Sequence, residues 1–194
     1  MNPAGQFNLF DATPPAPEGF AYRPELIGAE AERGLIEAFR SLPFARFQFR
    51  GFEGNRRVVS FGWRYDFNQG GLKPAEAIPE FLHPLRDSAA QLLGRPAEAL
   101  EQVLVTEYAP GAGIGWHRDR PEFGEVAGVS LGSPCLFRLR RRQGPGWERV
   151  SLTAEPRAGY VLKGDARTGW EHSIPPVDSL RWSVTFRTLT RRAG

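Results

Sequence analysis

The segment GIGWHRDRPEFG (residues 113–124) holds one of the chain's three histidines, two places before an aspartate. In a β-strand, side chains at positions i and i+2 point to the same face. The pattern therefore puts His117 and Asp119 on one side of a strand and Trp116 and Arg118 on the other. An imidazole and a carboxylate on one face supply two ligands of a metal site. A third ligand has to come from elsewhere in the chain.

The two other histidines differ in their surroundings. His83 comes directly before Pro84 in a predicted helix, and we interpret it as a structural or surface residue. His172, in the segment GWEHSI, lies in a predicted late strand. Two histidines and one carboxylate form the facial triad of non-haem Fe(II) oxygenases, which leaves positions open for a co-substrate and O2. From these three residues alone, a chance H-x-D pair with a distant histidine is an equal alternative.

The segment RWSVTFR (residues 181–187) alternates polar with apolar residues and predicts a half-buried strand. It places Arg181 and Arg187 on one face, at opposite ends. A buried guanidinium needs an anionic partner, because an unpaired charge away from water costs several kcal/mol. A ligand with a carboxylate at each end, such as 2-oxoglutarate, suits this pair, with one carboxylate held by a bidentate arginine. The alternative for a single strand arginine is a surface salt bridge.

Composition sets broad limits. The chain has 194 residues, which fits one domain over residues 21–194 with a proline-rich, flexible arm over residues 1–20. The net charge is +3, and nearly all of the basic residues are arginine. This excess of arginine is compatible with nucleic-acid binding, although a general compositional bias towards arginine, alanine and glycine explains it better. No apolar run approaches the roughly 18 residues of a membrane span, and the start lacks signal-peptide features. A single cysteine, Cys135, excludes an internal disulfide. We expect a cytoplasmic monomer that does not insert into membranes.

The order of elements indicates an α+β protein. Apolar residues at helical spacing predict amphipathic helices over residues 28–42 and 74–94, the second closed by Gly94. From about residue 100 the pattern changes to short apolar runs separated by turn residues, which is typical of a β-sandwich or barrel. These runs cover residues 102–108, 126–132, 134–142, 148–154, 159–164, 168–174 and 180–189. We therefore expect a jelly-roll core with two supporting N-terminal helices.

Taken together, the motifs resemble those of the AlkB-type Fe(II)/2-oxoglutarate-dependent dioxygenases. The resemblance rests on EYAPGAGIGWHRD (107–119), EHSI (171–174) and RWSVTFR (181–187), in this order, with GVSLGSPCLFRLRRR (128–142) between them. It extends over about residues 20–190. It implies a double-stranded β-helix as the jelly-roll core, at about residues 100–190. It also implies a substrate-recognition lid at about residues 44–72.

The resemblance also assigns roles by position. Fe(II) would be held by the catalytic residues His117, Asp119 and His172, and O2 would react there. The co-substrate 2-oxoglutarate would be bound by Tyr108, Thr106, Arg181, Ser183 and Arg187, with Arg181 on the distal carboxylate and Arg187 nearer the metal-chelating end. The family usually has asparagine at the positions of Thr106 and Ser183, and both replacements keep a hydrogen-bonding side chain. Some members carry an acidic residue where this chain has Pro121.

Members of this family oxidise alkyl groups on nucleobases such as 1-methyladenine or 3-methylcytosine in DNA or RNA, releasing formaldehyde, succinate and CO2. A base inside a duplex cannot reach the metal, so it must be flipped or single-stranded and then stacked on aromatic side chains. The segment RRVVSFGWRYDF (56–67) suits this task. The expected substrate-binding residues are Phe61, Trp63 and Tyr65, with Phe67 on the same face, and the arginines Arg57, Arg118 and Arg120, joined by Arg56 and Arg64.

The sequence alone leaves other interpretations of these residues and of the function open. Alternating aromatics in a strand also suit a hydrophobic core, and the basic run RLRRR (138–142) suits a solvated strand end. The same oxygenase chemistry acting on protein side chains or a small molecule is a second hypothesis. A metal-free jelly-roll binding module is a third.

Overall fold

The computed structural model describes residues 16–49 and 52–190. Most of the predicted arm, residues 1–15, lies outside the described residues. Strand β1 (Phe20–Arg23) pairs antiparallel with β11 (Gly159–Leu162), so the chain is part of the domain from residue 20 onward.

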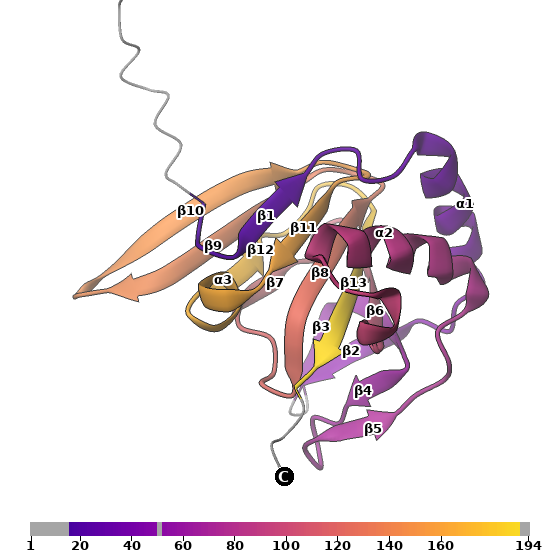
Figure 1. Ribbon diagram of the computed structural model, residues 1–194, viewed down its shortest axis with the longest axis horizontal. Coiled ribbons are helices and arrows are strands. Elements are labelled where there is room, and N and C mark those ends of the chain that lie inside the picture. Colours follow the sequence, from indigo (N-terminus) through magenta and orange to yellow (C-terminus); the bar gives the residue numbers. More distant parts are fainter. Residues whose placement is uncertain (1–15, 50–51, 191–194) are drawn as a thin grey trace, which may run out of the picture.

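Two antiparallel sheets dominate the fold (Figure 1). The larger has seven strands in the order β1-β11-β8-β13-β6-β3-β2, and the smaller has four in the order β10-β9-β12-β7. The bounds of the remaining strands are Ala45–Phe49 (β2), Phe52–Phe61 (β3), Trp63–Tyr65 (β4), Leu72–Pro74 (β5), Gln102–Tyr108 (β6), Ile114–His117 (β7), Phe123–Leu131 (β8), Cys135–Gln143 (β9), Gly146–Ala154 (β10), Glu171–Ile174 (β12) and Arg181–Leu189 (β13). Every run predicted as a strand beyond residue 100 overlaps an observed strand, and the arrangement is consistent with a jelly-roll core.

Helices α1 (Ala29–Phe39) and α2 (His83–Leu93) lie against one face of the larger sheet (Figure 1). The second predicted helix is shorter than expected, because Pro74 and Pro79 favour extended chain before it. Gly94, at φ +74°, ends α2 as predicted. Short helices occupy Glu80–Leu82 (η1), Ala97–Ala99 (η2) and Gly164–Thr168 (α3). Within the described residues, no helix has the length and apolarity that crossing a membrane requires.

Strand β13 divides the core into two parts. Val184 and Phe186 face the helices, in a cluster with Leu35 and Leu85. The alternate residues of β13, among them Arg181 and Arg187, line a cavity between the two sheets. Both guanidinium groups are buried, with 2% and 7% of the residue exposed, as the alternation in the sequence predicts.

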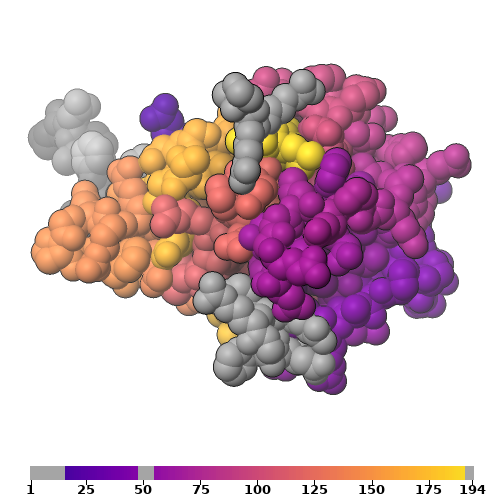
Figure 2. Space-filling model, turned by 90° about the horizontal axis from the view of Figure 1, so that it is seen from below, coloured from indigo at the N-terminus to yellow at the C-terminus, as the bar shows by residue number. Residues whose placement is uncertain are grey.

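The segment predicted as a lid, residues 44–72, forms one edge of the larger sheet and the small β4-β5 ribbon. Seen from below in Figure 2, its purple surface and the orange surface of the β9-β10 hairpin lie on either side of coral residues from the middle of the chain. Gly62 breaks the strand between β3 and β4 at φ +73°, where a Cβ would lie 2.0 Å from the carbonyl oxygen of Glu101. The alternation does not continue across this break. Phe61 is the last residue of β3 and alternates with Ser60, which lines the cavity, so it lies in the core, 3% exposed, and its prediction as a substrate-binding residue is wrong.

Candidate metal centre and its cavity

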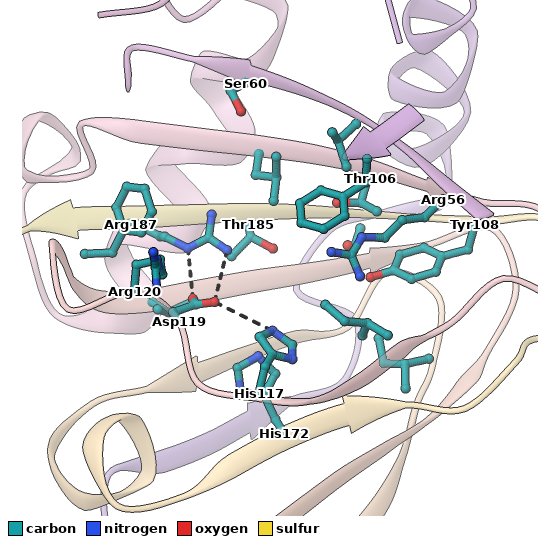
Figure 3. A pocket seen from close by; sticks show the side chains of 18 of the residues that line it. Arg56, Ser60, Thr106, Tyr108, His117, Asp119, Arg120, His172, Thr185 and Arg187 are labelled. Carbon is teal, nitrogen blue, oxygen red and sulfur yellow. Dashed lines mark hydrogen bonds and ion pairs between the residues drawn. The ribbon is translucent and has the colours of Figure 1, made fainter. Parts of the chain in front are cut away.

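The three predicted metal ligands converge at one end of the cavity. Strands β7 and β12 pair so that His117 and His172 lie directly opposite each other, with ring centroids 4.2 Å apart. Strand β7 ends at His117, and Asp119 follows in a loop rather than in the strand that the sequence suggested. Its Oδ1 lies 3.9 Å from His117 Nε2. One ligand atom from each of the three residues lies within 4.8 Å of the others (Figure 3).

The protonation states of these groups suit a metal ion. Burial, followed by the charge of neighbouring His117, lowers the pKa of His172 to about 3. Burial likewise lowers the pKa of His117. Both imidazoles are therefore neutral at pH 7, which is the form that binds metal. For Asp119, burial acts to raise the pKa, but the positive charge of Arg187 and its hydrogen bonds outweigh burial and hold the pKa well below its usual range.

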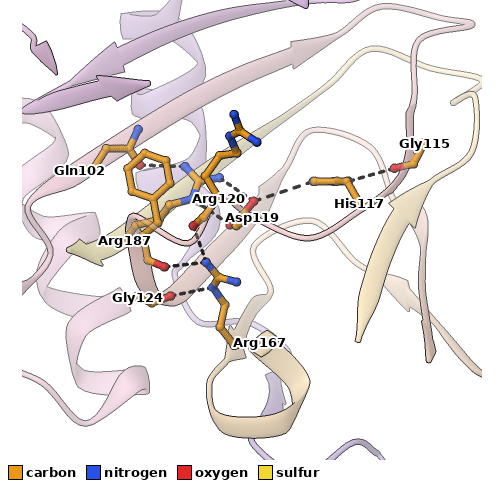
Figure 4. Close-up of polar contacts among 9 residues, drawn as sticks. Gln102, Gly115, His117, Asp119, Arg120, Gly124, Arg167 and Arg187 are labelled. Carbon is orange, nitrogen blue, oxygen red and sulfur yellow. Dashed lines mark hydrogen bonds and ion pairs between the residues drawn. The ribbon is translucent and has the colours of Figure 1, made fainter. Parts of the chain in front are cut away.

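Arg187 fixes the orientation of the Asp119 carboxylate. Its Nε donates to Asp119 Oδ2 at 2.9 Å and its Nη2 to Oδ1 at 3.4 Å, while Nη1 donates to Gln102 Oε1 at 2.8 Å (Figure 4). Both partners of the ion pair are about nine-tenths buried. Its contact with the co-substrate stays a prediction, because in the structure its donors are directed at Asp119 and Gln102.

Among the described residues, the buried guanidinium of Arg181 has no anionic partner. Its Nη2 donates to Ser130 Oγ at 3.1 Å, and its guanidinium lies 4.7 Å from the centre of the Tyr108 ring. Its Nε and Nη1 are buried and have no hydrogen-bond partner among the described residues. Leaving charged donors unpaired is costly, so they require an anionic ligand. A carboxylate of 2-oxoglutarate fits this place, and Thr106 and Ser183, paired in register beside it, also line the cavity.

The cavity between the sheets has a volume of about 860 Å³. Most of the residues predicted to bind substrate line it, namely Arg56, Arg64, Tyr65, Phe67, Arg118 and Arg120. Arg120 Nη2 donates to the Tyr65 hydroxyl at 2.5 Å, with its guanidinium 4.2 Å from the ring centre. Arg118 Nη1 donates to the carbonyl of Thr168 at 3.0 Å.

Trp63 and Arg57 do not line the cavity. Trp63 is half-buried in the β4-β5 ribbon. Arg57 follows Arg56 on β3, so the two point to opposite faces. Its Nη2 lies 2.7 Å from Glu107 Oε1, and an arginine held in this way is not directed at a substrate in the cavity.

Three residues that support the site were missed or were given another role. Gln102 alternates with Val103 and Val105 in β6, so its inward direction was visible in the sequence. Arg56 was predicted only as one of several substrate-binding arginines, and the structure places it in the lining of the cavity beside the co-substrate residues. Arg167 donates to the carbonyls of Arg120, Phe123 and Gly124 at 2.6–2.8 Å (Figure 4). Because these partners are backbone groups more than 40 positions away, no residue pattern in the sequence predicts them.

The sequence model of the 2OG-Fe(II) oxygenase superfamily matches residues 44–188, which include the whole triad and both buried arginines of β13. The chain belongs to the 2OG-Fe(II) oxygenase superfamily. The family implies Fe(II), 2-oxoglutarate and O2 as cofactors, and the triad and the unpaired donors of Arg181 fit the first two.

Relatives place the chain among the AlkB-type members. It is 34% identical to the uncharacterised protein L905 of Acanthamoeba polyphaga mimivirus, over 89% of this chain and 86% of that protein. It is 36% identical to the alpha-ketoglutarate-dependent dioxygenase AlkB of Escherichia coli K12, over 62% of this chain and 60% of that protein. It is 26% identical to the alkylated DNA repair protein ALKBH8 homolog of Arabidopsis thaliana, over 70% of this chain. The chain spans only 47% of the Arabidopsis relative.

A solved structure confirms the fold. The structure of OsALKBH1 superimposes with a TM-score of 0.67 over 88% of this chain and 96% of that chain. The sequence identity is 17%, so this likeness concerns the fold alone.

Proposed function

We propose that this oxygenase removes N-alkyl groups from nucleobases of DNA or RNA by oxidation, releasing formaldehyde, succinate and CO2. The observation that carries the proposal is one cavity with two kinds of lining. It contains the triad and the unpaired donors of Arg181, and it also contains an aromatic wall of Tyr65 and Phe67 beside Arg120. The names of the E. coli and Arabidopsis relatives, an AlkB dioxygenase and an alkylated DNA repair protein, support the same substrate class.

When bound, Fe(II) with 2-oxoglutarate and O2 supplies the oxidation of a C–H bond. His117, Asp119 and His172 would hold the metal through neutral imidazoles and an ionised carboxylate. Arg187 keeps that carboxylate in place, and its burial beside Asp119 prevents water from competing for the ion pair. Arg181, stacked against Tyr108, would bind the distal carboxylate of 2-oxoglutarate.

The aromatic wall would receive the target base. A base has to leave the helical stack to reach a buried metal, and it then gains stacking on aromatic side chains. Tyr65 is held by Arg120 on one side and packs edge-on against Phe67, with ring centroids 5.0 Å apart. This packing limits the motion of the tyrosine ring before the substrate arrives. A monomeric state and a cytoplasmic location belong to the same proposal and stay predictions.

The test is a panel of singly methylated DNA and RNA oligonucleotides, matched in sequence, with formaldehyde and succinate measured for each. We expect formaldehyde in stoichiometric amounts with succinate from at least one oligonucleotide. Asp119→Ala should abolish both products, whereas the surface variant Arg95→Gln should keep them. Formaldehyde from methylated peptides or small molecules, with none from any oligonucleotide, would refute a nucleic-acid substrate while keeping the oxygenase chemistry.

A further inference from the structure

We propose that the cavity selects alkylated bases that are uncharged and carry carbonyl oxygens, such as N3-methyluracil, N3-methylthymine or N1-methylguanine, over bases that become cations on alkylation. Arg56 is the residue that we hold responsible. This inference rests on the proposed function and adds the class of lesion.

Arg56 is directed into the cavity from β3. Its Cα is paired in register with Tyr108, whose other neighbour in the sheet is Arg181, so Arg56 lies in the row of the co-substrate residues. Figure 3 shows its guanidinium beside the Tyr108 hydroxyl, on the side of the cavity that faces the triad. The guanidinium also lies 3.9 Å from the centre of the Phe47 ring. Stacking on one face leaves the N–H edges free to donate in the plane of the group.

Within the part of the chain that the structure describes, no carboxylate forms an ion pair with Arg56. Asp119 is the only acidic residue among the described residues that line the cavity, and both of its oxygens are held by Arg187. Arg118 and Arg120 have neutral partners, a carbonyl and a hydroxyl. Bound Fe(II) and the 2-oxoglutarate dianion carry opposite and equal charges, so loading the cofactors leaves the excess of positive charge unchanged.

Alkylated bases differ in charge for a simple reason. In adenine N1 and cytosine N3 the ring nitrogen uses its lone pair to bond the methyl group, so the base becomes a cation. In guanine N1 and in uracil or thymine N3 the methyl group replaces a hydrogen, so the base stays neutral. N3-methyluracil and N3-methylthymine present a carbonyl oxygen on each side of the methylated nitrogen, and N1-methylguanine presents one carbonyl oxygen and one amino group. N1-methyladenine presents an amino group and no carbonyl oxygen, and N3-methylcytosine presents one amino group and one carbonyl oxygen. Charge therefore separates all four lesions, and the number of carbonyl acceptors separates methylthymine from methyladenine.

An arginine offers donors only, and it repels a nearby cation. Arg56 therefore matches a carbonyl oxygen of a neutral base, where its two N–H edges make charge-assisted hydrogen bonds. A cationic base in the same place meets a like charge, and its amino group is a donor that the Arg56 donors cannot bind. Because the cavity wall is buried, water screens this repulsion less than at the surface. Selection follows from charge and hydrogen-bond direction together.

The experiment compares kcat/KM for formaldehyde release from four single-stranded oligonucleotides of one sequence, each with one lesion: N3-methylthymine, N1-methylguanine, N3-methylcytosine or N1-methyladenine. We expect the two neutral lesions to be favoured by about tenfold or more. Cationic lesions turned over equally well or faster would overturn the inference and leave the proposed function intact. If formaldehyde is released neither from these four oligonucleotides nor from any other alkylated oligonucleotide, the proposed function itself is overturned.

Arg56→Gln removes the charge and keeps hydrogen-bonding groups, and we expect it to reduce the preference to within about threefold. The matched control is Arg57→Gln, which removes the same charge from the other face of β3 and should keep the wild-type preference. Arg56→Lys keeps the charge and should keep the discrimination against cations. An unchanged preference in Arg56→Gln would overturn the role of Arg56. So would a raised KM for 2-oxoglutarate with the preference unchanged, which would assign Arg56 to the co-substrate.

Equilibrium binding gives a readout without turnover. Fluorescence anisotropy of the same four oligonucleotides with protein lacking added iron should show the same order of affinities, reduced in Arg56→Gln. Equal affinities for neutral and cationic lesions in the wild-type protein would contradict selection by charge.

Discussion

Replacing Arg187 with methionine tests how much the Arg187 guanidinium stabilises the buried carboxylate of Asp119. The substitution removes the guanidinium that holds both oxygens of Asp119, at 2.9 and 3.4 Å, in a place where each side chain is about nine-tenths buried. Breaking a buried pair from one side costs about 3–5 kcal/mol, because the remaining charge has no compensation. For a domain of this size, that corresponds to a fall in melting temperature of roughly 6–20 °C.

Thermal denaturation monitored by circular dichroism, without metal, measures the loss. The control is Arg95→Met, which breaks the bidentate but exposed pair with Glu125 and should lower the melting temperature far less. Adding Asp119→Asn to Arg187→Met removes the unpaired charge and should restore much of the stability. Saturating Mn(II) should also reduce the deficit of Arg187→Met, since the ion supplies a positive charge beside Asp119. The reasoning is refuted if Arg187→Met is no less stable than Arg95→Met.

Arg181→Met should raise the KM for 2-oxoglutarate by more than about 100-fold while metal affinity, measured by calorimetry, is retained, and an unchanged KM would remove its assignment to a carboxylate. Arg167→Met leaves three backbone carbonyls of the segment after Asp119 without their donor and should destabilise the protein by about 2–4 kcal/mol in urea denaturation. An unchanged stability would show that this segment does not depend on Arg167. Gly62→Ala places a Cβ against the carbonyl oxygen of Glu101 at positive φ and should destabilise the protein. A stability equal to wild type in the same assay would contradict the described turn. Tyr65→Ala should weaken oligonucleotide binding by about 1–3 kcal/mol, and Trp63→Ala should have less effect; the reverse order would place Trp63 at the base.

Much of the site could be predicted because the chemistry needs particular residue types. A facial triad needs two histidines and a carboxylate, and with only three histidines in the chain few combinations exist. The alternation around Arg181 and Arg187 showed that both point the same way, and their burial follows from the period of a strand. What alternation did not show was their partners. Arg187 binds Asp119, 68 positions away, and only the folded chain brings these two together.

The substrate side was predicted less well, and Gly62 explains why. The alternation of Phe61, Trp63 and Tyr65 predicts one face only if the strand is continuous, and a residue at positive φ interrupts it. Phe61 then joins the core, whereas Tyr65 reaches the cavity. The helix predicted over residues 74–94 is present but begins only at His83, since its apolar spacing continued through prolines that keep the backbone extended. Local breaks of this kind decide which residues of a periodic pattern meet a ligand.

The central claim is that three distant side chains form one iron site next to an unpaired arginine. Anaerobic calorimetric titration with Fe(II), with and without 2-oxoglutarate, tests it most directly. We predict one Fe(II) per chain, bound more tightly with 2-oxoglutarate present. Asp119→Ala and His172→Ala should lose the ion, and Arg181→Met should keep it but lose the effect of 2-oxoglutarate. Fe(II) binding of wild-type strength in Asp119→Ala or His172→Ala would contradict the account, as would no binding in the wild-type protein.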